Sequence, residues 1–437
     1  MTDTPAPAAN RLTILVLGGN GFVGAHLVAA LRQAGHRVVR GLRHAPDDDA
    51  DAVSCDFTRD LVADVWMPRL TGVDIVVNAI GILRESGSNR FDAIHRQAPL
   101  AVAKACIAAD VRCFVQISSL GNPADGEFIA SKHRFDDELS QMPLASVILR
   151  PSVVYAWSGS YGGTSLLRAL AATALVLPVP GDGKQRMQPM EAEDLGRLVV
   201  AIVESVPAPR GMYEVGGPEQ LGLRDYLLHW RRWLRIDGER VLPVPLPLVA
   251  MGIWLAERFG KGPMGKTVWQ MLVRGNVCEA DALTRLQHDF RFRPRSLEQV
   301  LGEHPSQVQD RWRARLYPFV PILSVAMALV WIVSGLVGLL TSPAQIELLA
   351  AHSLLGGMHP VGFARACGVL DLVLGSSLLF GLRTRQVVLA MLISVLAYTL
   401  LFGVLLPALW FDPLGGLLKN LIVLPALIAL FVLLDRR

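Results

Sequence analysis

Charged residues are scarce in this 437-residue sequence, at 18%, whereas apolar residues make up 52%. That balance is too apolar for an ordinary soluble enzyme, so it indicates a membrane-embedded part. The net charge of +4 comes without any long run of Lys or Arg. Such a run is the usual mark of a nucleic-acid-binding surface, so we expect no nucleic acid among the partners.

Cysteine is also rare, and its five residues show no spacing typical of a metal site. An odd number of scattered cysteines predicts reduced thiols in a cytosolic domain, with one further thiol in a membrane helix. The polar first ten residues contain no apolar stretch, so we expect a loose tail over residues 1–10 and no cleavable signal peptide. The cysteines are Cys55, Cys106, Cys113, Cys278 and Cys367.

The charges almost vanish after Tyr317. Four apolar runs follow, each close to the roughly 20 residues that a helix needs to cross a hydrocarbon core of roughly 30 Å. A buried soluble bundle is the alternative, but four successive runs leave no polar face for water. The sequence therefore predicts a globular domain over 11–316 and an all-α domain of four transmembrane helices over 317–437. The runs are 318–340, 362–382, 386–406 and 414–434.

Arginine residues fall only on alternate connections of these runs. Cationic loops are retained on the cytoplasmic side during membrane insertion. We therefore expect a bacterial-type inner membrane protein that contacts the lipid bilayer and has both termini and the large N-terminal domain in the cytoplasm. Arg311, Arg313 and Arg315 precede the first run, Arg383 and Arg385 separate the second and third, Arg436 and Arg437 end the chain, and the connections 341–361 and 407–413 hold no Lys or Arg.

The start of the globular domain carries a glycine pattern between a strand and a helix. Residues 12–17 predict a short buried strand, and a helix is expected over 25–34. Glycines at 18, 21 and 24 lie between them and would allow a tight turn, a close approach of backbone to a pyrophosphate, and packing of the helix against the strand. The pattern predicts a dinucleotide-binding loop.

The end of the second predicted strand, 36–42, bears on the choice of cofactor. A site selective for NAD places Asp or Glu there to hold the ribose 2′-hydroxyl. This sequence instead has Arg40 and Arg43. Because a guanidinium suits a 2′-phosphate, NADP(H) is favoured, with NAD(H) as the alternative.

Four further strands are expected over 52–55, 73–78, 113–117 and 146–149, each ending in small or polar residues. Strands that alternate with helices predict an α/β fold, a Rossmann-type doubly wound parallel sheet. The carboxyl ends of such strands form the edge where ligands bind.

Several segments together resemble the atypical short-chain dehydrogenases/reductases, nearest to the proteins similar to the nucleotide-binding accessory subunit of respiratory complex I. The segments are GGNGFVG (18–24), Asp56-Phe57, Asn78 to Gly81, FVQISSLG (114–121), Ser131-Lys132, LRPSVVY (149–155), PGDGKQRMQP (180–189) and YEVGGPE (213–219). The C-terminal part resembles the DoxX-like membrane family in 368–372, 381–385, 413–415 and Lys419-Asn420.

The resemblance implies NAD(P)(H) binding and assigns roles to individual residues. Gly18, Gly19, Asn20, Gly21, Phe22, Val23 and Gly24 would hold the pyrophosphate, Asp56 and Phe57 would flank the adenine, Ala79, Ile80 and Gly81 would approach the ribose, and Ser118, Lys132, Pro151 and Val153 would lie near the nicotinamide.

The sequence departs from the commoner family pattern at Phe128. The usual residue four positions before the Lys is a Tyr, which passes the proton that accompanies hydride transfer. Phenylalanine has no proton to give, so three hypotheses stay open. Tyr155 or Tyr161 serves as the acid beside Lys132 and Ser118, the nucleotide is a structural or sensing ligand, or the reaction needs no Tyr.

The substrate region is expected over about 151–300. Arg186 lies in a turn-rich loop and is a candidate substrate contact, or an ordinary exposed arginine. The apolar segment 243–260 is too short to span a membrane and is expected either as a core helix or as a helix resting on the bilayer. In the membrane domain, Asp371 is a functional candidate because an ionisable group is unfavourable at mid-bilayer, although helix packing would also explain it.

Two functions of different kinds follow from these observations. The first is a membrane-anchored NAD(P)(H)-dependent oxidoreductase or isomerase that acts on a lipid-soluble substrate such as a quinone or isoprenoid. The second is a non-catalytic NADP(H)-binding structural or sensor module of a membrane protein complex, which the phenylalanine at position 128 favours.

Overall fold

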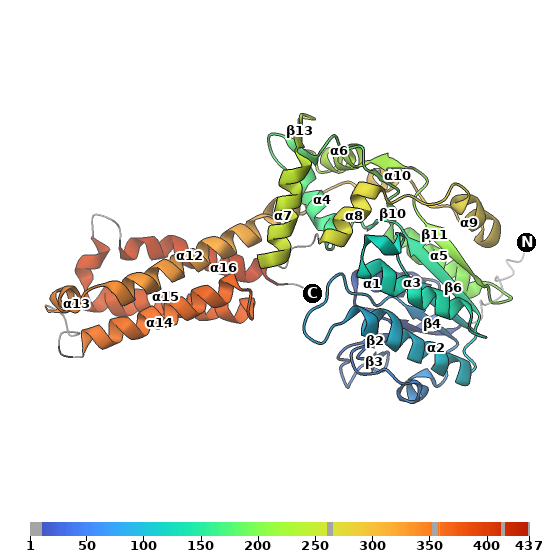
Figure 1. The fold of residues 1–437 in the computed structure, drawn as a ribbon, viewed down its shortest axis with the longest axis horizontal. Coiled ribbons are helices and arrows are strands. Elements are labelled where there is room, and N and C mark those ends of the chain that lie inside the picture. Colours follow the sequence, from blue (N-terminus) through green and yellow to red (C-terminus); the bar gives the residue numbers. More distant parts are fainter. Residues whose placement is uncertain (1–10, 260–264, 352–356, 358, 412–415, 436–437) are drawn as a thin grey trace, which may run out of the picture. The chain divides into compact units, whose positions relative to one another are not determined.

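The computed structural model describes residues 11–259, 265–351, 357, 359–411 and 416–435 (Figure 1). They form two compact units, one from residues up to 257 with 262–314, and the other from 258–261 with 315–437. This division falls close to the change in composition at Tyr317. The expected tail over residues 1–10 lies outside the described residues.

A seven-stranded parallel sheet forms the centre of the first unit, in the order β11-β6-β5-β4-β1-β2-β3. Val16 of β1 pairs with Arg40 of β2 on one side and with Val77 of β4 on the other. The strand order reverses between β1 and β4, which opens a crevice at their carboxyl ends. The predicted doubly wound sheet is confirmed, although the sequence analysis does not predict β11. The strands are β1 (Thr13–Leu17), β2 (Arg37–Leu42), β3 (Ala52–Ser54), β4 (Ile75–Asn78), β5 (Cys113–Ile117), β6 (Ser146–Pro151) and β11 (Gly211–Val215).

Helices cover both faces of this sheet (Figure 1). The strands β1, β4, β5 and β6 are nearly continuous apolar runs because both of their faces are buried. On one face, Leu27, Leu198 and Leu286 join the core beneath the helices, and on the other face Val102 and Phe135 do so. The first face is covered by α1 (Phe22–Gln33), α5 (Ala192–Glu204) and α9 (Ala282–Phe290), and the second by α2 (Ala98–Ala108) and α3 (Glu127–Ser140).

A third core lies in the region expected to bind substrate, where Tyr155, Trp230 and Val300 are buried together. Three short strand pairs frame it, β7 with β10, β9 with β12 and β8 with β13. Their bounds are β7 (Val154–Tyr155), β8 (Leu177–Pro180), β9 (Arg186–Met187), β10 (Met190–Glu191), β12 (Leu221–Gly222) and β13 (Val241–Val244). The helices of this region are α4 (Gly163–Ala171), α6 (Leu223–Trp233), α7 (Leu246–Phe259), α8 (Lys266–Arg274), α10 (Leu297–Glu303) and α11 (Val308–Leu316).

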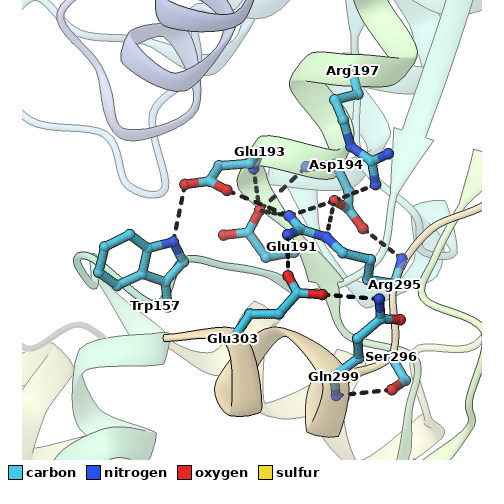
Figure 2. A network of polar contacts seen from close by, with 9 residues as sticks. All are labelled: Trp157, Glu191, Glu193, Asp194, Arg197, Arg295, Ser296, Gln299 and Glu303. Atoms are coloured by element: carbon cyan, nitrogen blue, oxygen red, sulfur yellow. Dashed lines mark hydrogen bonds and ion pairs between the residues drawn. The ribbon is translucent and has the colours of Figure 1, made fainter. Parts of the chain in front are cut away.

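Arg295 ties the segment before α10 to the start of α5 (Figure 2). Its guanidinium lies 2.8 Å from Asp194 and 2.7 Å from Glu303, and its backbone N–H donates to Asp194 at 2.6 Å. Glu191 and Glu193 also face it, at 3.9 and 3.4 Å. Glu191 caps α5, and burial raises the pKa of its carboxyl to about 7. We refer to these five residues as the Arg295 clamp.

The apolar segment 243–260 forms α7, which exposes much of its apolar surface. Leu248, Met251 and Trp254 are each more than half exposed, whereas Ile253 is buried. A core helix would bury these side chains, so the core-helix alternative is wrong for them. An exposed apolar face is what the alternative of a helix on the bilayer requires.

The second unit is a helical bundle, and within its described residues three helices are long and apolar enough to span a membrane, α12 (Phe319–Leu340), α14 (Pro360–Leu379) and α15 (Thr384–Leu405). The fourth predicted run is shorter as a helix, from Leu417 to Leu433, and begins with the tight turn η7 (Leu417–Lys419) before α16 (Asn420–Leu433). The sequence analysis also does not predict α13 (Pro343–Ala350) in the connection 341–361. Residues 413–415, part of the DoxX-like resemblance, lie outside the described residues.

Close helix packing and the side chain of Arg365 join α12 to α14 in this bundle. A Cβ atom on Gly335 of α12 would lie 2.7 Å from the carbonyl oxygen of Gly368 on α14, so the two backbones touch here. Arg365 donates to the carbonyl oxygens of Gly338, Leu339 and Thr341, which are the unpaired acceptors at the end of α12. That contact explains an arginine within an apolar helix.

Candidate functional site

The glycine loop closes the crevice at the end of β1. Gly18 adopts a φ of +78°, and a side chain there would also meet Ile80 at 2.9 Å. Gly24 lies so close to this turn that a Cβ atom would be 2.1 Å from the Gly18 carbonyl oxygen. Both positions therefore require glycine. The contact of Gly18 with Ile80 brings the loops after β1 and β4 together.

The first turn of α1 follows directly, three residues earlier than the sequence predicts, with Gly21 as its N-cap. No side chain caps this end, so its amide groups are available for an anion. Asn20 and Gly21 are exposed, and the ring of Tyr161 stacks on Phe22 at 6.2 Å. The loop thus offers backbone donors for a pyrophosphate, which fits a dinucleotide.

A polar hollow of about 320 Å³ lies beside the ends of β2 and β3. Arg43 and Arg59 give it positive charge, and Asp56 gives it one carboxylate. Arg43 donates to Asn89 at 2.9 Å. Arg40 instead forms an ion pair with Asp49 and leans toward Asn20. The second strand therefore directs Arg43, and not Arg40, into the hollow. The ring of Phe57 packs in the core against Trp66, so only the backbone of Phe57 is left to contact an adenine.

Lys132 lies within α3, where this helix passes the carboxyl ends of β4 and β5. Its ammonium donates to the Ile117 carbonyl oxygen at 3.1 Å, and a Cβ atom on Gly81 would lie only 3.2 Å from it. Burial lowers the pKa of Lys132 to about 8, against a smaller opposing effect of Asp136. The structure thus brings Lys132 together with Gly81, next to Ala79 and Ile80.

The side chain of Phe128 lies one helical turn before Lys132, with the ammonium 5.9 Å from its ring centre. The ring also packs edge-on against His95 at 5.7 Å. His95 accepts from the Ile82 amide through Nε2, so Nδ1 carries the proton toward Ser131, at 2.8 Å. Burial and the nearby Lys132 lower the pKa of His95 to about 2, which keeps it neutral. Sequence reasoning missed His95, because no local pattern links it to α3.

Ser118, which follows β5, is held in place by Asp136 of α3. Its hydroxyl donates to Asp136 at 2.7 Å, and Arg150 donates to the same carboxylate oxygen at 2.9 Å. Burial raises the pKa of Asp136. With its proton directed at Asp136, Ser118 has lone pairs but no free donor for a substrate. Asp136 was missed too, although its spacing of four residues from Lys132 was a usable signal.

The remaining predicted site residues differ in how far they are exposed. Tyr155 is 1% exposed and packs against Trp230 in the third core, so its hydroxyl is not presented to a substrate. Burial also raises the pKa of the Tyr155 phenol. The burial of Tyr155 disfavours the acid role proposed for it, whereas Tyr161 is 63% exposed beside the glycine loop. Pro151 is buried at the end of β6, Val153 is half-buried, and Arg186 is exposed and bonded to Gln220.

Comparison with known families follows the two units. Residues 14–216 match the NAD dependent epimerase/dehydratase family, and residues 328–429 match the DoxX-like family. A ceramide reductase of Caulobacter vibrioides is 29% identical over 202 residues, which cover 44% of this chain and 61% of that protein. An epimerase family protein of Mycobacterium leprae is 27% identical and covered over 62% of its length, so the chain spans about three fifths of these two relatives. A Streptomyces 3-diazoavenalumate denitrifying reductase is 26% identical over 56% of this chain and 90% of its own.

Solved structures show the same fold. MoeE5, in complex with UDP-glucuronic acid and NAD, has a TM-score of 0.50 at 18% identity, covering 69% of this chain and 99% of its own. An epimerase from Methanothermobacter thermautotrophicus has a TM-score of 0.50 at 16% identity, covering 71% and 94%. The sheet order, the glycine loop and both family matches agree. The chain therefore joins an N-terminal domain that matches the NAD dependent epimerase/dehydratase family over residues 14–216 to a C-terminal domain that matches the DoxX-like family over residues 328–429.

Proposed function

We propose that the protein is a membrane-anchored NADP(H)-dependent reductase for a lipid-soluble carbonyl compound. The observation that carries the proposal is the position of Lys132, buried at the strand ends beside Gly81 and next to the glycine loop. Reductases among the relatives, one of them named for a ceramide, support the reaction class and a lipid-like substrate. The DoxX-like domain would keep the enzyme at the bilayer, where such a substrate resides.

The residues of the crevice suit this chemistry. The nucleotide, when bound, supplies the hydride. The glycine loop and the first turn of α1 would hold its pyrophosphate, and Lys132 would hold the ribose near the nicotinamide. A pKa of about 8 also lets the ammonium of Lys132 give a proton to the carbonyl oxygen near neutral pH. Lys132 would then do the work that the tyrosine does elsewhere, because Phe128 has no hydroxyl.

The reaction can be tested without knowing the substrate. The full chain in nanodiscs is incubated with deuteride-labelled NADPH and a total bacterial lipid extract, and deuterium in the lipids is measured by mass spectrometry. We expect deuterium in one lipid class, loss of that signal in Lys132→Met, and no change in Lys104→Met, an exposed lysine on α2. Nucleotide binding without any deuterium transfer would instead support the non-catalytic NADP(H)-binding module, the second function that Phe128 favours.

The choice of NADP(H) is a separate prediction. Arg43 is exposed at the polar hollow, where a 2′-phosphate would fit between it and Arg59. A charge-assisted bond of this kind is worth roughly 1.5–3 kcal/mol, so Arg43→Ala should weaken NADPH about tenfold or more and leave NADH unchanged. The measurement is isothermal titration with both nucleotides, and Arg37→Ala, outside the hollow on β2, is the matched control. Equal weakening of both nucleotides would rule out the contact.

A further inference from the structure

The membrane domain contains a cavity of its own. It has a volume of about 230 Å³ and lies among α12, α13, α14 and α15. Its walls are almost wholly apolar, with Phe363 and Phe402 in edge-to-face contact at 6.2 Å on one side. Ala364, Ile346 and Leu349 line it as well. In a domain that spans hydrocarbon, such a space fits an apolar chain better than water, which needs polar partners.

One corner of this cavity is polar. Cys367 lies on its wall, and the Cys367 thiol is in hydrogen-bonding contact with the Tyr398 hydroxyl. Tyr398 also reaches Asp371, at 3.4 Å, and Ser334 donates to the other oxygen of Asp371 at 2.8 Å. The Ser334–Asp371 bond would by itself join α12 to α14, so this joining does not require Tyr398 or Cys367. These two side chains continue the row of polar groups from Asp371 to the cavity.

The charges around the cavity restrict the ligand's polar end. Arg365, the cation nearest in sequence on α14, directs its guanidinium to the carbonyl oxygens at the end of α12. The polar corner holds a carboxyl, a phenol and a thiol, and none of these three groups is a cation that could pair with a carboxylate or phosphate. A hydroxyl can donate to the phenol oxygen, whose own proton is directed at Asp371, and a hydroxyl or carbonyl oxygen can accept from the thiol, without any counter-ion.

We propose that the DoxX-like domain binds a neutral single-chain lipid, with its hydrocarbon in this cavity and its terminal hydroxyl or carbonyl oxygen against Cys367 and Tyr398. The proposal does not depend on the reductase function. Fatty alcohols and prenols share the required chemistry, and the experiment separates these two sources.

The test uses the full chain in phosphatidylcholine nanodiscs with three photoreactive probes, a hexadecanol, a geranylgeraniol and a palmitic acid that each carry a diazirine. Crosslinked residues are mapped by peptide mass spectrometry. We expect one neutral probe to label the walls near Phe363 and Phe402, and the palmitic acid to label them about tenfold less. The neutral probe that labels more strongly identifies the source. Equal labelling by palmitic acid would contradict a neutral polar end.

Two variants of α14 give a matched pair. Ala364→Phe places a ring in the cavity, whereas Ala366→Phe adds the same ring at an exposed position two residues along. We expect labelling to fall about tenfold only in Ala364→Phe, and Tyr398→Phe to lower it as well. A readout on the unaltered protein accompanies them, since unlabelled alcohol should slow alkylation of Cys367 by N-ethylmaleimide. Labelling spread over the lipid-facing side chains, or alkylation that the alcohol does not change, would overturn the proposal.

Discussion

Lys132 shows how one functional side chain opposes stability. Its pKa falls from 10.5 to about 8 because burial disfavours the ammonium. Below pH 8 the amine is protonated in both the folded and unfolded states, and the folded state bears the full desolvation penalty. Between pH 8 and 10.5 only the unfolded chain holds the proton, so stability rises with pH across that window. The nucleotide-free protein is therefore destabilised by this residue at neutral pH.

Lys132→Met should accordingly raise the apparent Tm of the nucleotide-free protein at pH 7. Each pKa unit corresponds to about 1.4 kcal/mol, which gives an upper estimate of about 3 kcal/mol less the lost bond to Ile117. The gain should shrink as the pH approaches 10.5, and stabilisation by NADPH should be lost. Differential scanning fluorimetry of both proteins from pH 6 to 10 checks this. A destabilised variant at pH 7 would mean that the lysine is structurally favourable.

The residues of the candidate site differ in how visible they are to sequence reasoning. Gly18 and Gly24 are predictable because a tight turn and a close helix leave no room for a Cβ atom. Lys132 is recognisable only by its family motif. His95 belongs to a π-helical turn, η3 (Ala93–Gln97), and meets α3 only through the folded chain, so nothing in its neighbourhood signals it. The sequence suggests a site role for Tyr155 because an aromatic residue at the end of a strand can belong either to a site or to the buried core.

At the scale of elements, the Arg295 clamp holds α10 onto the start of α5. The side chains of Glu191 and Asp194 are fully buried, and Arg295 is their main source of positive charge together with Arg197. Removing one partner of a buried ion pair leaves an uncompensated charge, which typically costs about 3–5 kcal/mol. Arg295→Ala should therefore lower the apparent Tm by several degrees and expose the segment near α10 to protease.

Arg293→Ala is the matched control for this prediction. Arg293 lies two residues away and bonds only to the exposed Gln287 among the contacts described. Limited proteolysis with mass-spectrometric mapping, together with the thermal measurement, distinguishes the two variants. If Arg295→Ala behaves like Arg293→Ala, the clamp contributes little to the stability of the protein, as exposed ion pairs usually do.

Most of the strands follow from sequence because their apolar runs are buried on both faces, as β5 illustrates. The pairs β7 with β10 and β9 with β12 do not, since each has only two residues in register and depends on residues distant in the sequence. In the membrane domain, hydropathy locates α12, α14 and α15 well. It overestimates α16, because apolar composition does not show that the chain first makes the η7 turn.

At the scale of the whole molecule, the arrangement of arginines predicts the orientation in the membrane. An impermeant thiol reagent added to intact cells should label Ser342→Cys, at the N-cap of α13, and should not label Thr384→Cys, at the first turn of α15. The physical reason is that cationic connections stay in the cytoplasm during insertion. Labelling after cell lysis controls for reactivity at both positions. Labelling of Thr384→Cys alone in intact cells would reverse the orientation.

The Arg295 clamp also has a mechanical consequence. The chain passes from the nucleotide-binding unit to α12 through α10 and α11, so a pull that the bilayer exerts on α12 arrives along that segment. The clamp joins this segment to Asp194, 101 residues earlier in the sequence. Several ion pairs and one backbone hydrogen bond make this connection and would divide the force between them. Tension is thus taken up at the start of α5, before it can reach α9 or the sheet. The crevice between β1 and β4 would keep its shape while the membrane moves.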